Sequence, residues 1–531
     1  MQRHIVYSAI VWLLAVVTAA VAAPTEEGPL VMSRAEYEGR VQAAWLGQII
    51  GVLATFPYEH QVSSVLPVTA LPKPYEAAIL DDDWYYEMVA LRGFETHGIE
   101  MTIGQLGQMW RKHNCGTWGS SRQARLAMES GVPPAEAGLP QNNPLWFTIG
   151  PMFSCELYGL LAPGDPNLAG QLARALGRIN GHAEGLDAGI FSAGVVSAAF
   201  RESDSRDVVR QATLLIHPDS PMWQALEQVI RLAEAGKSFA EVCGAVEDRW
   251  HIEYPATNNA VANAAIMATC IWFGEGDFGK SLNLAASAGD FVDADNIAAT
   301  SCAVVGAMKG MQALPEAIVA QLHDRIAGTA VGGLKATPPV DESISALARR
   351  TAAVGAKMLA AHGAEVTDDT LSIPQCEVTA PPLERFRLAD FAQLWNPDWT
   401  LERAGFGGGD GGLRGIRGQT HLEGKVLATY PRDEVRGLVL RRVVTPPAGA
   451  ALTFRAGVDP DRAWRLAVYV GNRRVFDKLI EAPEAKERQW QDVRVDLSEH
   501  AGQEVTLRLF QLVLDGNKTA GNAYWKDVQV K

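Results

Sequence analysis

The sequence contains few cysteines for its length. Six of its 531 residues are Cys, and none of them belongs to a CxxC pair or to a Cys/His spacing typical of a zinc site. A small fold held together by disulfides and a Cys-based zinc centre are therefore excluded. We interpret the cysteines mostly as small core residues.

Basic residues are also scarce relative to acidic ones. The chain has 47 Lys and Arg against 61 Asp and Glu, which gives a net charge of −14. Proteins that grip nucleic acid or lie on anionic membrane surfaces need clusters of Lys and Arg that neutralise phosphate. The composition argues against both roles, whereas 47% hydrophobic and 8% aromatic residues are typical of a folded protein.

Beyond its first residues the sequence has no apolar run of about eighteen residues, the length that a membrane-spanning helix requires. The start itself is typical of a signal peptide. Arg3 and His4 precede an apolar run over residues 5–17, and residues 20–22 form a small-residue cleavage signature. We predict cleavage after Ala22, a secreted or periplasmic (extracytoplasmic) location and no stable membrane insertion afterwards. The alternative is an uncleaved anchor.

Two different hydrophobic periods divide the rest of the chain. Residues 23–366 carry apolar side chains at intervals of three and four, which predicts a packed array of helices. The pattern fails over residues 367–383, where Pro374 and two later prolines mark a linker. Residues 384–531 contain short segments of period two, such as 466–470, separated by turn residues. We therefore expect a multidomain protein, with an all-α domain followed by an all-β sandwich of jelly-roll type.

The negative charge belongs to the helical part. Residues 384–531 hold 23 basic and 20 acidic residues, a net charge of +3, whereas residues 23–383 hold 23 basic and 41 acidic residues, a net charge of −18. A surplus of carboxylates is often only a solvated surface. Clustering is more informative, because adjacent carboxylates repel one another unless a cation is bound between them.

Three adjacent carboxylates, Asp81, Asp82 and Asp83, stand directly before a predicted helix over residues 84–97. Helix capping and the helix dipole explain one or two acidic residues at such a place. Three exceed what capping requires, and several oxygen ligands at one point suit a hard cation such as Mg²⁺. These residues alone leave both capping and metal binding open.

A second acidic cluster precedes another predicted helix, over residues 297–309. It consists of Asp290, Asp293, Asp295 and the adjacent Asn296, and the helix that follows is rich in Ala, Ser and Gly. Small residues allow a helix to pack closely in an interior, where unpaired carboxylates are energetically costly. The two clusters are therefore candidates to converge on a dinuclear metal centre.

Three segments together resemble the ADP-ribosylglycohydrolase family. They read GQIIGVLATFPYE at residues 47–59, DDDWYYEMVALRGFETHG at 81–98 and DADNIAATSCAVVGA at 293–307. The segments between them also look like those of larger bacterial members, so the resemblance spans about residues 32–360 in the same order. It implies an all-α fold, two Mg²⁺ ions and hydrolysis of the bond between C1 of a sugar and its leaving group. The C-terminal sandwich lies outside the resemblance.

The motifs of the family carry over to individual residues of this chain. The resemblance implies a set of metal ligands: Asp81, Asp82, Asp83, Asp293, Asp295 and Asn296. It also implies a catalytic acid/base at Glu59, eight positions after Gly51. Asp81 and Asn296 replace two threonines of the family's metal shell, and both still offer an oxygen ligand. Asp290 is a rival to Asp293 as a ligand.

Two further residues are candidate substrate contacts. His182 resembles a histidine in the middle segment of the family, although a lone His is more often structural. Trp84 follows the three Asp where the family has Thr, and its side chain cannot bind metal. Without the resemblance, Glu59 has an alternative interpretation as an exposed loop carboxylate.

The predicted compartment favours a glycan as substrate, because ADP-ribosylated proteins are mainly intracellular. Sandwiches appended to secreted glycan-active enzymes are often carbohydrate-binding modules. This one has five aromatic residues that are either sugar-stacking platforms or core: Trp464, Tyr469, Trp490, Tyr524 and Trp525. Our leading hypothesis is a secreted Mg²⁺-dependent glycoside hydrolase that cleaves a glycosidic bond in a glycan or glycoconjugate. The alternatives are a hydrolase that removes ADP-ribose from a modified protein or small molecule, and a non-catalytic glycan-binding protein.

Overall fold

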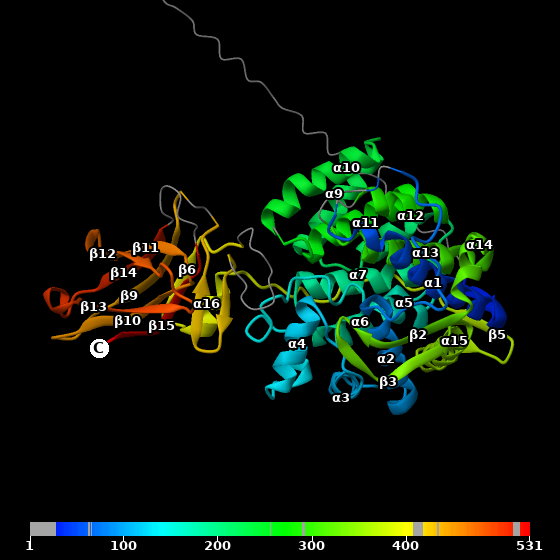
Figure 1. Cartoon of the computed structure of the whole chain (residues 1–531), viewed down its shortest axis with the longest axis horizontal. Helices are drawn as coiled ribbons and strands as arrows, with labels where there is room; N and C mark the ends of the chain where they lie inside the picture. The colour runs from blue at the N-terminus through cyan, green and yellow to red at the C-terminus, as the bar shows by residue number, and fades with distance from the viewer. Residues whose placement is uncertain are drawn as a thin grey trace, which may run out of the picture.

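The chain forms a helical domain followed by a strand-rich domain (Figure 1). The computed structural model describes residues 28–61, 64, 66–254, 256–288, 292–406, 418–432, 435–512 and 521–531. The predicted signal peptide and Asp290 lie outside the described residues. The predicted fold class, a helical domain followed by a β-sandwich, is confirmed.

The helices of the first domain begin mostly at polar caps, as at Ser33, Thr102 and Ser238, whose side chains accept backbone N–H groups of the first turn. Among the described residues, none of the helices has the length and apolar character needed to cross a membrane. Their bounds are α1 (Arg34–Thr55), α2 (Asp82–His97), α3 (Ile103–His113), α4 (Gly119–Glu129), α5 (Glu156–Leu161), α6 (Pro166–Leu176), α7 (Glu184–Ala198), α8 (Ser205–Thr213), α9 (Pro221–Glu234), α10 (Phe239–Val246), α11 (Ala260–Gly274), α12 (Phe278–Ser287), α13 (Ala294–Lys309), α14 (Glu316–Val319) and α15 (Ile344–Ala361).

Helices α1 and α13 pack unusually closely in the centre of this domain. A Cβ added at Gly51 of α1 would lie 2.6 Å from the carbonyl oxygen of Ala298, and Gly47 and Gly306 face the partner backbone in the same way. Nearly every residue of α13 is buried, which explains its Ala, Ser and Gly content. The C-terminal end of α1 thereby meets the N-terminal end of α13.

Two small sheets complete the helical domain. Strands β2 (Arg325–Val331) and β3 (Leu334–Ser343) form an antiparallel hairpin. Strands β1 (Leu30–Ser33), β5 (Thr370–Ile373) and β4 (Glu365–Val366) form a sheet in the order β1-β5-β4. The beginning of the predicted linker, residues 367–383, is therefore part of the helical domain, because β5 pairs with the strand that precedes α1.

The second domain consists of two antiparallel five-stranded sheets, ordered β13-β10-β15-β8-β7 and β12-β11-β14-β9-β6. Buried side chains alternate along strands such as β14, as expected for a sandwich with its core between the sheets. Its elements are α16 (Asp390–Trp395), β6 (Thr400–Glu402), β7 (His421–Glu423), β8 (Val426–Thr429), β9 (Leu438–Val444), β10 (Ala451–Val458), β11 (Ala463–Val470), β12 (Arg473–Glu481), β13 (Gln489–Asp496), β14 (Val505–Leu512) and β15 (Ala523–Val530).

The aromatic residues of the sandwich divide between core and surface. Trp464, Tyr524 and Trp525 are at most 3% exposed, and the two Trp rings pack together in the core. Trp490 and Tyr469 are only partly buried and lie on different sheets. Two of the five aromatic candidates, Trp464 and Trp525, are thus core residues of the sandwich, and Tyr524 is buried opposite Gly457.

The cysteines are free, and the structure places five of the six in the interior. Cys115, Cys155, Cys270 and Cys302 are completely buried, and burial raises the pKa of each thiol above its ordinary value. Cys376 is exposed. This agrees with their interpretation as small core residues.

The two domains make specific contacts. Glu384 forms ion pairs with Arg174 and Arg178 of the helical domain, and its carboxylate also lies beside the His182 ring. Phe406, shortly after β6, packs against Phe147, with ring centroids 4.5 Å apart, and also against the ring of Tyr254. The sandwich is therefore docked on the loops that precede α5 and α11.

Candidate metal and catalytic centre

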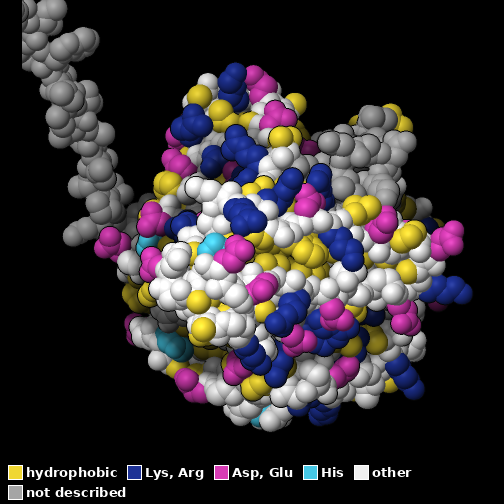
Figure 2. Space-filling view, turned by 90° about the vertical axis from the view of Figure 1, so that its left-hand side faces the viewer, with side chains coloured by type: hydrophobic (Ala, Val, Ile, Leu, Met, Phe, Trp, Pro, Cys, Tyr) yellow, Lys and Arg dark blue, Asp and Glu magenta, His cyan; other side chains and the backbone are white. Residues whose placement is uncertain are grey.

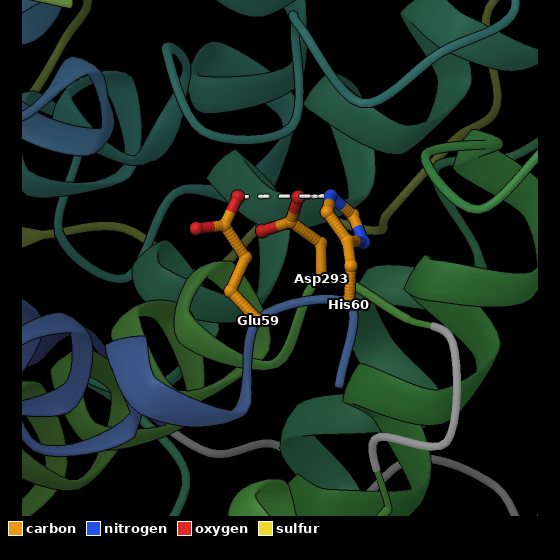
Figure 3. A group of neighbouring side chains, drawn as sticks. All are labelled: Glu59, His60 and Asp293. Atoms are coloured by element: carbon orange, nitrogen blue, oxygen red, sulfur yellow. Dashed lines mark ion pairs between the residues drawn. The ribbon is translucent and has the colours of Figure 1, made fainter. Parts of the chain in front are cut away.

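The residues just after α1 and just before α13 form the first part of the site. Glu59 and His60 follow the short 3-10 helix η1 (Phe56–Tyr58), and Asp293 is the residue before α13. Nε2 of His60 lies 3.5 Å from Oδ2 of Asp293 and 3.6 Å from Oε1 of Glu59. Figure 3 shows the three side chains extending in the same direction, with the His60 ring facing both carboxylates. One ligand atom from each lies within 4.8 Å of the others.

The start of α2 supplies the second part. Asp81 is the N-cap of α2, and its Oδ1 accepts the backbone N–H of Asp83 at 3.2 Å. Asp81 and Asp83 are buried, with 8% and 4% exposure, and Asp82 is partly exposed. Gln48 of α1 donates to the carbonyl oxygen of Asp83 at 2.9 Å, which ties the start of α2 to α1. Helix capping thus explains Asp81, and it leaves the carboxylates of Asp82 and Asp83 unexplained.

Helix α13 joins the two acidic clusters. Nδ2 of Asn296 donates to Oδ1 of Asp83 at 3.0 Å, across 213 residues of sequence. Asp295 is 5% exposed, and neither its Oδ1 nor Oδ1 of Asn296 has a hydrogen-bond partner among the described residues. The predicted convergence of the two clusters is therefore present in the structure.

Burial and mutual repulsion shift the pKa values of this group upward. Burial, followed by the charges of Asp293 and Asp81, raises the pKa of Glu59 to about 7. Burial raises the pKa of Asp81 to about 6, and the Asp293 charge adds to the effect. Burial and neighbouring carboxylates raise the pKa values of Asp82, Asp83 and Asp295 well above their ordinary range.

The donor set fits divalent cations. The site offers five Asp carboxyl groups, whose oxygen atoms are the ligands that Mg²⁺ prefers. Two of its buried oxygen atoms have no hydrogen-bond partner among the described residues. A positive charge among these groups would offset both the repulsion and the burial that raise their pKa values. Which residues would hold it follows from the sequence prediction: Asp81, Asp82, Asp83, Asp293, Asp295 and Asn296. Sequence reasoning did not include His60, whose ring nitrogen lies within ligand distance of the same group.

Two asparagines missed by sequence reasoning hold Asp293 in place. Nδ2 of Asn258 donates to Oδ2 of Asp293 at 3.0 Å, and Oδ1 of Asn263 accepts its backbone N–H at 2.9 Å. Both come from the segment at the start of α11, which contains an Asn-Asn pair. These polar residues before a buried helix were the feature from which the sequence could have predicted the contact. Phe406 of the second domain packs on Tyr254 and Phe147 beside this segment, where backbone bonds join Ile149 to Asn258.

A pair of buried acids lies behind the start of α2. Glu87 and Glu156 are at most 1% exposed. Burial and the neighbouring Glu156 raise the pKa of Glu87, while burial raises the pKa of Glu156 to about 7. Thr300 of α13 donates to Oε1 of Glu156 at 2.6 Å, and Gln48 reaches Oε2 of Glu87 at 3.4 Å. This pair connects α2, α5 and α13 beneath the site.

The two predicted substrate contacts lie elsewhere. Trp84 has 0% exposure and belongs to the core, so it has no surface to offer a substrate in this structure. His182 lies at the domain interface, with Nδ1 3.3 Å from Oε2 of Glu384 and its ring beside those of Trp146 and Phe386. Burial, and then Arg178, lowers its pKa to about 4.

Comparison with known proteins identifies the family of the helical domain. The family model described as ADP-ribosylglycohydrolase matches residues 33–360. A solved structure of an ADP-ribosylglycohydrolase-related protein complex is 18% identical and covers 60% of this chain and 99% of its own, with a TM-score of 0.43. No curated protein matches the chain.

Two similar solved structures are carbohydrate-binding modules. One, from work on the structure and function of CBM4, is 17% identical and covers 26% of this chain and 90% of its own, with a TM-score of 0.18. The other, a family 35 module from Clostridium thermocellum, is 13% identical and covers 24% of this chain and 90% of its own, with a TM-score of 0.17. The family match, by contrast, extends over more than half of the chain and includes every residue of the candidate centre. The chain therefore belongs to the ADP-ribosylglycohydrolase family.

Proposed function

We propose that the protein is an extracytoplasmic, Mg²⁺-dependent hydrolase that cleaves a glycosidic bond in a glycan or glycoconjugate. The observation that carries this proposal is the meeting of the buried residues Asp81, Asp83, Asp293 and Asp295 with the partly exposed Asp82 and Glu59. Carboxylates that only decorate a surface do not gather in an interior, because their burial costs free energy. A glycosidase needs such groups to stabilise an oxocarbenium-like transition state and to move a proton.

Glu59 is the proposed general acid/base. Its raised pKa, about 7, keeps a substantial fraction of the carboxyl protonated near neutral pH, as donation to a leaving oxygen requires. It is also about one-third exposed, so a substrate can reach it. Bound Mg²⁺, with two ions expected, would orient sugar hydroxyls and lower the pKa of a bound water. Asn258 and Asn263 keep Asp293 beside Glu59 and His60.

The choice of a glycan over ADP-ribose rests on two arguments. The predicted signal peptide exposes the enzyme to polysaccharides and glycoconjugates, and the exchange of two family threonines for Asp81 and Asn296 changes the surroundings of the substrate. Family membership favours the second candidate function, removal of ADP-ribose from a modified protein or small molecule. A decayed, purely glycan-binding protein is disfavoured, because selection for binding alone would not maintain repelling carboxylates in the interior.

Hydrolysis assays distinguish these functions. The protein without its predicted signal segment is incubated with a panel of nitrophenyl glycosides and oligosaccharides and, separately, with an ADP-ribosylated peptide. Each substrate is tested once with Mg²⁺ and once with chelator. We expect turnover of at least one glycoside that the chelator abolishes and that Glu59→Gln lowers at least a hundredfold. Turnover of the ADP-ribosylated peptide alone would reject the glycan proposal in favour of the second candidate. Turnover unaffected by chelator would reject the role of the metal.

A further inference from the structure

The outer face of the sheet β13-β10-β15 carries an aromatic ring that lies against a glycine. Gly457 of β10 pairs with Trp490 of β13, and a Cβ at Gly457 would come within 3.1 Å of two atoms of the indole ring. The ring therefore covers Gly457, and only a residue without a side chain allows this position. The ring thus lies against the backbone of Gly457, while Trp490 stays partly exposed.

Two cationic side chains flank this ring. Arg455 pairs with Lys526 across the β10–β15 ladder, one row along from Gly457. The guanidinium carbon of Arg455 lies 5.4 Å from the centroid of the Trp490 ring, and Nζ of Lys526 lies 6.0 Å from it. Arg455 is 42% exposed, and its only ion pair among the described residues is with the largely exposed Asp492, at 3.4 Å. Two positive charges therefore lie beside the Trp490 ring.

A shallow cavity of about 360 Å³ continues from Arg455 along the same strands. Six of its eight lining residues are polar or charged, namely Thr453, Arg455, Asp492, Arg494, Asp527 and Gln529, and the other two are Phe454 and Val493. Together with Trp490 and Lys526 these residues form what we call the Trp490 face. Figure 2 looks onto the sandwich end of the molecule. Over this end as a whole, Lys and Arg side chains are interspersed with Asp, Glu and hydrophobic side chains.

We propose that the Trp490 face binds an acidic polysaccharide, with uronate residues as the recognised sugars. A pyranose ring stacks on the exposed part of the indole, its carboxylate meets Arg455 and Lys526, and hydroxyls further along the chain reach Asp492, Arg494 and Gln529. This surface lies on the second domain, so the inference goes beyond the proposed hydrolase activity and does not require it.

The mixture of charges selects this ligand over other polyanions. The face has three basic residues, Arg455, Arg494 and Lys526, against the two acidic residues Asp492 and Asp527. Carboxylates repel closely spaced phosphates but accept hydrogen bonds from sugar hydroxyls, so a nucleic acid is the poorer fit. A neutral glycan would use the ring but offer no carboxylate to Arg455 and Lys526.

The test measures binding of the full-length protein, with chelator present so that hydrolysis does not interfere. The probes are polygalacturonate, the same polymer with its carboxylates methyl-esterified, and single-stranded DNA. We expect polygalacturonate to bind at least about tenfold more tightly than the other two, and its binding to weaken with added salt. Equal binding of the esterified polymer would overturn the role of the cations, and tighter binding of DNA would overturn the choice of ligand.

Variants locate the binding surface. Trp490→Ala and Arg455→Gln each weaken polygalacturonate binding about tenfold or more, Trp490→Phe retains most of it, and all keep the circular dichroism and melting temperature of a folded sandwich. Tyr469→Ala, which removes a half-buried aromatic from the opposite sheet, is the matched control and binds as wild type. Wild-type affinity in folded Trp490→Ala would contradict the proposal, whatever the hydrolysis assays show.

Discussion

Replacing Asp81 by Asn makes the metal-free protein more stable if the acidic group exists to hold a cation. Asp81 caps α2 through Oδ1, and Asn caps a helix equally well, so the substitution removes a charge and leaves the cap intact. A structural carboxylate would instead lose stability on substitution. The direction of the change therefore separates the two roles.

The magnitude follows from the pKa of Asp81, which burial raises from 3.8 to about 6. In the unfolded chain this carboxyl ionises at lower pH than in the folded one, so wild-type stability falls as the pH rises through the folded-state pKa. The advantage of Asp81→Asn over wild type grows from about 0.5 kcal/mol near pH 4 to about 3 kcal/mol near pH 8. Relief of Asp82 and Glu59, which Asp81 repels, acts in the same direction.

Urea unfolding in chelator, followed by circular dichroism at both pH values, measures this difference. Asp277→Asn is the matched control, because Asp277 is an exposed Asp N-cap of α12 and its substitution changes stability by less than about 0.5 kcal/mol. Saturating Mg²⁺ should stabilise wild type by about 2–3 kcal/mol and the variant by less. A metal-free Asp81→Asn less stable than wild type near pH 8 would refute the reasoning.

Three further substitutions test individual parts of the account. Glu59→Gln should lower kcat about 10²- to 10⁴-fold in steady-state assays while calorimetry still detects Mg²⁺; unchanged kcat would exclude Glu59 as the acid/base. His60→Ala should weaken Mg²⁺ binding about tenfold or more, as loss of a ligand or of its support does, and wild-type affinity would leave His60 outside the centre. Phe406→Ala removes an aromatic contact to Tyr254 and Phe147 and should lower the free energy of unfolding by about 1–3 kcal/mol. It should also lower kcat/KM several-fold. Unaltered kinetics in the folded variant would show that docking of the sandwich does not influence the site.

The sequence predicted the fold class and the meeting of the two acidic clusters, for a physical reason. Period-3.6 and period-2 patterns report which faces are buried, and they separated the helical domain from the sandwich. The Ala- and Gly-rich stretch after Asp295 indicated a buried, closely packed helix, and Gly51 against Ala298 is the contact that brings the clusters together. The family match over residues 33–360 confirmed the resemblance predicted for about residues 32–360.

The parts that sequence reasoning missed depend on tertiary contacts between distant segments. His60 adjoins Glu59 in sequence, but it becomes a candidate ligand only because the fold brings it next to Asp293. Asn258, in the loop before α11, likewise reaches Asp293 only in the folded chain. Trp84 was predicted as a substrate contact because it adjoins Asp83, yet helix geometry directs it into the core. His182 became an interface residue because Glu384, two hundred residues later, docks on it.

Calorimetric titration of Mg²⁺ into metal-free wild type and into Asp293→Ala tests the central claim most directly, because Asp293 is the residue through which the α1 end and the α13 start form one centre. The account predicts a saturable binding heat in wild type that is lost in Asp293→Ala, while circular dichroism shows both chains folded. Absence of binding in wild type, or the same isotherm in both proteins, would contradict it.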